Sequence, residues 1–132
     1  MITVMVNGCF DVLHYGHLLH LREAANMGDR LIVALTEDAW VRKGPGRPIN
    51  QWEHRAEMLR ELRCVDQVFR TIGSVAALRE YRPDIFVKGV DYAAGDRWTE
   101  GVEAVCREVG AKLTFTSTPK MSATDIIRKA LT

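Results

Sequence analysis

The chain has 132 residues, a length that supports one domain with a single hydrophobic core. Hydrophobic residues make up 47% of the sequence, which excludes an intrinsically disordered chain, and no apolar stretch is long enough to span a bilayer. The formal net charge is +1 at pH 7, so no general basic field argues for a nucleic-acid partner, and local groups must capture any bound anion.

Short apolar runs alternate with helical patterns along the whole chain. Strands are expected at five runs rich in Val, Ile, Leu and Phe: residues 2–6, 31–35, 65–69, 85–87 and 112–115. Helices are expected near five segments: residues 17–27, 51–62, 75–81, 99–109 and 123–130. This alternation predicts a single α/β domain over residues 1–132, with a five-stranded parallel sheet and helices on both faces.

Glycine and serine mark several helix ends. Gly28 and Gly110 are expected to stop the first and fourth helices, and Ser74 and Ser122 to cap the third and fifth. Two connections, residues 36–50 and 89–98, are too long for simple turns. Both should leave the carboxyl ends of strands, where open α/β sheets bind ligands.

The three cysteines, Cys9, Cys64 and Cys106, are odd in number, far apart and without metal-ligand spacing. We expect reduced thiols in a cytoplasmic protein, since no targeting signal precedes the first apolar run. Cys9 follows the first strand closely, where an inert packed thiol is the favoured interpretation.

Two histidines lie at the first strand-to-helix turn, in the segment His14-Tyr15-Gly16-His17. A helix start presents unpaired N–H groups and a partial positive charge, which suit a phosphate. Imidazoles placed there can donate hydrogen bonds to phosphate oxygens. On spacing alone, one histidine could instead cap the helix while the other is exposed. The strand before the pair and the helix after it favour a phosphate-binding site.

The ten residues from Gly8 to His17 resemble the G-x-F-D-x-x-H-x-G-H signature of the cytidylyltransferase-like nucleotidyltransferases, with every fixed position met. The resemblance implies a Rossmann-like fold. It also implies attack by a phosphate oxygen of a second substrate on the α-phosphorus of a nucleoside triphosphate, with release of pyrophosphate. Catalytic roles fall to His14 and His17. Asp11 would contact the substrate or, equally, brace the loop through backbone N–H groups.

Further expectations follow from the same resemblance. Four residues of this turn would lie at the nucleotide: Gly8, Cys9, Phe10 and Gly16. Mg²⁺ would be held mainly by the nucleotide phosphates, as hard cations often are. Relatives are commonly homodimers, so a homodimer is expected, with neither nucleic acid nor membrane as a partner.

Basic residues mark the second loop and helix. Arg47-Pro48-Ile49-Asn50 resembles the R-P-V/I-N run of the heptose-1-phosphate adenylyltransferases, and Glu53-His54-Arg55 resembles an E-H-R element whose arginine reaches the nucleotide phosphates. Without the resemblance, a basic loop before an exposed helix face would be favoured. The resemblance assigns catalytic roles to Lys43 and Arg55, and substrate binding to Asp38 and Arg47.

The segment Val87-Lys88-Gly89-Val90-Asp91-Tyr92 closely resembles the fourth strand and following loop of the heptose-phosphate enzymes. Lys88, Gly89 and Asp91 are therefore expected at the nucleotide. Lys88 could equally be a solvated lysine at a strand end.

Near the C-terminus, residues 121–127 resemble the I-S-T-T/S-x-I-I motif, in which a helix N-terminus holds the β- and γ-phosphates. Ser122 and Thr124 match and are expected at the nucleotide, whereas Ala123 replaces the middle threonine. Residues 117–120 read Ser-Thr-Pro-Lys where the cytidylyltransferases for glycerol or choline phosphate usually have R-T-E-G. This departure weakens an assignment to CTP and glycerol 3-phosphate.

Together these motifs predict transfer of AMP from ATP to a sugar 1-phosphate of the D-glycero-D-manno-heptose type. The alternative within the class is transfer of CMP from CTP to glycerol 3-phosphate or a similar phosphate. A nucleotide-binding module without catalysis is a different class, and the intact His14, His17 and Arg55 argue against it. A nucleic-acid-binding α/β domain has no support from the net charge.

Overall fold

Five parallel strands form the centre of the fold, in the order β3-β2-β1-β4-β5. The computed structural model describes residues 1–89, 97–117 and 123–131. The strands are β1 (Thr3–Gly8), β2 (Arg30–Thr36), β3 (Gln67–Thr71), β4 (Ile85–Lys88) and β5 (Lys112–Phe115). The helices are α1 (Tyr15–Ala25), α2 (Trp52–Arg60), α3 (Ser74–Tyr81), α4 (Arg97–Val109) and α5 (Ala123–Ala130), with a 3₁₀ helix, η1 (Asp38–Trp40).

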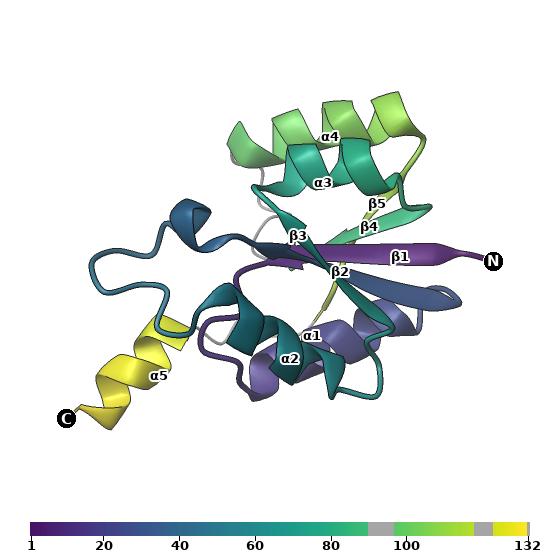
Figure 1. Cartoon of the computed structure of the whole chain (residues 1–132). Coiled ribbons are helices and arrows are strands. Elements are labelled where there is room, and N and C mark those ends of the chain that lie inside the picture. The colour runs from purple at the N-terminus through teal and green to yellow at the C-terminus, as the bar shows by residue number, and fades with distance from the viewer. Residues whose placement is uncertain (90–96, 118–122, 132) are drawn as a thin grey trace.

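Helices cover both faces of the sheet, with α1 and α2 on one face and α3 and α4 on the other (Figure 1). Alternate residues of β1 divide between the two resulting cores. Val4 and Val6 pack in the cluster with α1 and α2, whereas Met5 packs in the cluster with α3 and α4. This double burial explains the continuous apolar runs of the strands. Helix α5 extends away from the sheet (Figure 1).

The strand order reverses at β1, which pairs with β2 on one side and with β4 on the other. Ligands of open α/β sheets bind outside the carboxyl ends of the strands at such a switch point. The carboxyl ends of β1 and β4 therefore lie side by side at this point. The histidine turn follows β1, and Lys88 ends β4.

The five expected strands and five expected helices are all present, and the ends of all but β5 and α5 are shifted. Helix α1 begins at Tyr15, two residues before the expected start, because the His14 side chain caps it. Strand β3 begins at Gln67 rather than at residue 65, because the Val65 N–H is used in a turn to Leu62. The 3₁₀ helix η1 was not predicted, since a three-residue helix leaves no periodic pattern.

Three of the expected helix ends can be compared with the structure. The first helix ends before the expected stop at Gly28, because α1 ends at Ala25 and its C-cap is Asn26. Gly110 follows α4 with φ +76, in the left-handed region expected of a helix stop. Ser74 as an N-cap was wrong, because Gly73 is the cap and Ser74 is the first residue of α3. Ser122 lies outside the described residues. Among the described helices, none combines the length and the apolar character needed to cross a membrane.

Candidate active site

The side chains of His14 and His17 together cap the N-terminus of α1. His14 Nδ1 accepts the backbone N–H of Gly16 over 3.1 Å, and His17 Nδ1 accepts the backbone N–H of His14 over 3.2 Å. This reciprocal pattern is a capping box made with imidazoles. The two rings stack with centroids 3.8 Å apart, and the Phe10 ring meets His17 edge-on at 5.0 Å. The pair is therefore held rigidly at a helix start.

The hydrogen bonds of this box assign the protons on the rings. A ring nitrogen that accepts a hydrogen bond carries no proton, so a neutral imidazole in this box keeps its proton on Nε2. Burial, and then the charges of His14, Lys43 and His20, lower the pKa of His17 to about 3. At neutral pH, His17 is therefore a neutral ring whose Nε2–H is a donor, as a phosphate-binding group requires.

We expect the free energy of unfolding to fall as the pH is lowered from 6.5 toward 3. The pKa of His17 is about 3 in the folded chain, against an ordinary value of 6.5 when the chain unfolds. Between these values the unfolded chain binds a proton that the folded ring does not, so acid favours unfolding, by at most about 1.4 kcal/mol per pH unit. Urea denaturation over this range tests it. A slope that does not shrink in His17→Asn would contradict the assignment.

The carboxylate of Asp11 is fully buried and binds the end of the basic loop. It accepts the backbone N–H groups of Ile49 (2.7 Å) and Asn50 (2.9 Å) and the Nε–H of Arg47 (3.0 Å). Arg47 also donates to the Asp11 backbone carbonyl. Burial raises the pKa of Asp11, but the hydrogen bonds from Asn50, Ile49 and Arg47 outweigh it and leave the pKa below its usual value. Asp11 therefore braces the loop, which is the second of its two expected roles.

Arg55 is also fully buried, and it joins three segments beneath the site. Its guanidinium donates to the backbone carbonyls of Asn50 (2.8 Å) and Cys9 (2.9 Å) and to the Asp38 carboxylate (2.6 Å). The phosphate contact expected from the family motif stays a prediction. In this structure, the side chain holds the β1–α1 turn against the loop after β2, and Asp38 is its ion-pair partner.

A cavity of about 930 Å³ opens at the carboxyl ends of the strands, on the side of α3 and α4. Apolar side chains such as Val75 and Phe115 form much of its wall. Three of the expected site residues line it: Cys9, Lys43 and Lys88. Lys43 also lowers the pKa of His17, so its charge acts on the histidine pair as well as on the cavity.

The remaining expected residues are placed as follows. Gly8 ends β1, where a Cβ would lie 2.9 Å from Phe10 Cε2. Gly16 is buried in α1, and Gly89 directly follows β4. Thr124 of α5 accepts a hydrogen bond from Arg47 over 3.3 Å, so Arg47 links the Asp11 turn to α5. Asp91 and Ser122 lie outside the described residues.

Among the polar residues of the cavity wall that were not predicted as site residues, Asn7 and Ser74 stand together. Asn7 follows the apolar run of β1, and Ser74 was interpreted only as a helix cap. Both line the cavity, and they are hydrogen-bonded to each other. The polar Asn7 at the end of an apolar strand was the signal that the sequence offered.

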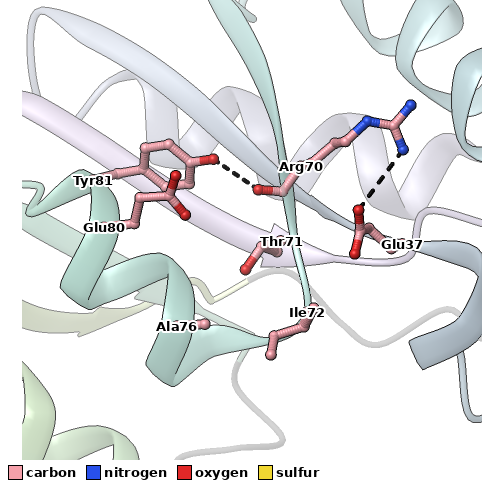
Figure 2. Close-up of a pocket in the computed structure, with 7 residues that line it drawn as sticks. All are labelled: Glu37, Arg70, Thr71, Ile72, Ala76, Glu80 and Tyr81. Carbon is pink, nitrogen blue, oxygen red and sulfur yellow. Dashed lines mark hydrogen bonds and ion pairs between the residues drawn. The ribbon is translucent and has the colours of Figure 1, made fainter.

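A second, smaller pocket of about 360 Å³ lies beside β3 and α3 (Figure 2). Tyr81 donates its hydroxyl to the Arg70 backbone carbonyl at 2.7 Å, and the Arg70 guanidinium lies 3.9 Å from Glu37. The described lining contains neither histidine of the pair and none of the other expected site residues. This pocket is therefore not part of the candidate site.

The described residues do not form a metal site, because they contain no group of three or more His, Cys, Asp or Glu side chains placed to hold an ion. The carboxylates of Asp11 and Asp38 are instead paired with Arg47 and Arg55. The three cysteines are free thiols, as expected.

Comparison with known proteins gives one family. A family model described as cytidylyltransferase-like matches residues 5–129. The bifunctional protein HldE of Pseudomonas fluorescens (strain Pf0-1) is 42% identical over 130 residues, covering 96% of this chain and 27% of the relative. HldE of Chromohalobacter salexigens is 47% identical over 107 residues, covering 78% of this chain and 22% of the relative. The chain thus spans about a quarter of the length of these curated relatives.

Solved structures give the same fold. The lipopolysaccharide core biosynthesis protein from Thermoplasma volcanium GSS1 superposes with a TM-score of 0.76 at 30% identity, covering 91% of this chain and 99% of that chain. Pantoate-β-alanine ligase from Francisella tularensis superposes with a TM-score of 0.65 at 15% identity, covering 96% and 67%. The second likeness shows the fold alone.

Proposed function

This chain belongs to the cytidylyltransferase-like family, and we propose that it transfers AMP from ATP to a sugar 1-phosphate of the D-glycero-D-manno-heptose type. The observation that carries the proposal is the histidine pair at the start of α1, with the His17 Nε2–H as a neutral donor. A helix N-terminus with such donors suits the triphosphate. The likeness to HldE proteins and to a lipopolysaccharide core biosynthesis protein supports a sugar phosphate as the acceptor.

The reaction forms one bond and breaks one. A phosphate oxygen of the acceptor bonds to the α-phosphorus, and the bond between that phosphorus and the oxygen bridging to the β-phosphate breaks, releasing pyrophosphate. The reaction needs no covalent enzyme intermediate, so the protein contributes by positioning the reactants and stabilising the charge that develops. The Nε2–H donors of His14 and His17 would bind the phosphate oxygens more tightly as charge develops. Lys43, which lines the cavity and acts electrostatically on His17, would add positive charge there.

Asp11 and Arg55 serve this arrangement by holding the backbone around the histidine turn. Asp11 holds residues 47–50 against the histidine turn, and the Arg55 guanidinium donates a hydrogen bond to the Cys9 carbonyl. A turn fixed from two sides keeps its donors in the geometry that the transition state requires.

Mg²⁺ is proposed to arrive with the nucleotide. The carboxylates of Asp11 and Asp38 are already paired with arginines, so these residues do not suit a protein-held ion. When bound, Mg²⁺ neutralises charge on the phosphates. We also propose a cytoplasmic homodimer, for which light scattering should give twice the 14.9 kDa mass of the chain.

The substrate proposal is tested by following pyrophosphate release with Mg²⁺. Each of ATP, CTP, GTP and UTP is combined with D-glycero-β-D-manno-heptose 1-phosphate, mannose 1-phosphate or glycerol 3-phosphate. The highest kcat/KM is expected for ATP with the heptose phosphate, because the segment after β5 departs from the cytidylyltransferase pattern. Preference for CTP with glycerol 3-phosphate would favour the alternative. Absence of turnover with every pair would reject nucleotidyl transfer to these acceptors.

A further inference from the structure

Three polar side chains from different elements form a series of hydrogen bonds along the cavity wall. Lys88 Nζ donates to Ser74 Oγ over 2.8 Å, and Ser74 Oγ donates to Asn7 Oδ1 over 2.6 Å. Asn7 Nδ2 in turn donates to the Ala34 carbonyl over 2.9 Å. This series of hydrogen bonds thus connects the ends of β4 and β1 with the start of α3. Asn7, Ser74 and Lys88 all line the cavity.

The direction of each hydrogen bond follows from Asn7. Its Nδ2 can only donate, and it does so to the Ala34 carbonyl and, at 3.3 Å, to Thr36 Oγ1. Its Oδ1 must therefore accept, so the Ser74 hydroxyl proton points to Asn7. The Ser74 oxygen is then an acceptor for the Lys88 ammonium. Ser74 consequently holds the charge of Lys88 in one position at the cavity.

The cavity lies on the side of the sheet that suits the acceptor. The histidine pair begins α1, whereas Val75 and Val102 of the cavity wall belong to α3 and α4, on the opposite face (Figure 1). In-line transfer places the attacking and leaving oxygens on opposite sides of the α-phosphorus. Because the proposed function puts the triphosphate at the start of α1, we assign the acceptor to the cavity. Lys43 lines the cavity, and its charge also lowers the pKa of His17.

We propose that Ser74 is a positioning residue that holds the Lys88 ammonium against a hydroxyl or anionic group of the phosphorylated acceptor. The inference rests on the proposed nucleotidyl transfer and adds to it a determinant of acceptor affinity. Asn7 acts indirectly, through Ser74, because it orients the Ser74 hydroxyl. This assigns Lys88 to the acceptor rather than to the nucleotide, where the family motif placed it, so nucleotide affinity should not depend on these three side chains.

The test compares KM for the acceptor with KM for the nucleotide in Ser74→Ala. With ATP and D-glycero-β-D-manno-heptose 1-phosphate, or with whichever pair the wild-type chain turns over best, KM for the acceptor should rise about tenfold. The value of kcat and KM for the nucleotide should change less than about twofold. Ser74→Thr keeps the hydroxyl and should restore KM for the acceptor. In a Lys88→Met background, Ser74→Ala should change that KM less than about twofold, because the two act as one unit.

Thr71→Val is the matched control. Thr71 Oγ1 donates to the Gly73 carbonyl over 2.8 Å in the same turn, but Thr71 lines the smaller pocket. Its removal should lower thermal stability without changing KM for the acceptor. An unchanged acceptor KM in Ser74→Ala, additive effects with Lys88→Met, or a change confined to the nucleotide KM would overturn the inference while wild-type turnover upholds the proposed function. A wild-type chain inactive with every pair would reject both.

Discussion

Replacing His17 by asparagine is expected to lower kcat by roughly 10²–10³-fold, the cost of losing one well-placed donor to developing charge. The asparagine Oδ1 can still accept the His14 backbone N–H that His17 Nδ1 accepts at 3.2 Å, so the helix cap should survive. What disappears is the Nε2–H donor. Pyrophosphate release measures the activity, and thermal unfolding shows whether the fold is retained.

His54→Asn is the matched control for this experiment. His54 lies on α2, is exposed, and contacts Gln51 through its ring at 3.1 Å. Its replacement should leave kcat unchanged. If His17→Asn stayed within a few-fold of the wild type, His17 would have no role in the transfer, and the helix cap would be its whole function.

Asp11→Ala is expected to lower the free energy of unfolding by about 3–5 kcal/mol, the usual cost of removing one partner from a buried ion pair. The side chains of Asp11 and Arg47 are 0% and 8% exposed, so the arginine left behind would be largely shielded from water. The N–H groups of Ile49 and Asn50 would also lose their acceptor. Urea denaturation measures the change. Such a loss is a large part of the stability of a small domain.

The control for Asp11 is an ion pair on the surface. Glu53 lies 2.9 Å from Arg70, and both side chains are largely exposed. Glu53→Gln should therefore shift the urea midpoint only slightly, since solvent screens such pairs. If Asp11→Ala unfolded at nearly the same urea concentration as Glu53→Gln, the loop 47–50 would be held by other contacts.

Local patterns in the sequence predicted the elements of this fold well. Strand β5 and helix α5 begin and end at the predicted residues, and the remaining elements shift by only a few positions. Continuous apolar runs and the helical period are properties of neighbouring residues, so the sequence displays them directly. The histidine turn was predicted for the same reason, since its motif is contiguous.

Roles that depend on distant partners could not be predicted in this way. The hydrogen bond from Ser74 to Asn7 joins residues 67 positions apart, and that from Arg55 to the Cys9 carbonyl joins residues 46 positions apart. Locally, Ser74 resembled a helix cap, and Arg55 resembled a residue of an exposed or phosphate-binding face. Only the parallel sheet, which brings the carboxyl ends of β1, β2 and β4 together, creates these contacts.

The most direct test of nucleotidyl transfer is to follow the α-phosphorus itself. ATP carrying a radioactive α-phosphate is incubated with the sugar 1-phosphate and Mg²⁺, in parallel with ATP labelled at the γ-phosphate. The α-label is expected in a sugar nucleotide and the γ-label in pyrophosphate. A γ-label found in the acceptor would show phosphoryl rather than nucleotidyl transfer and would contradict the account.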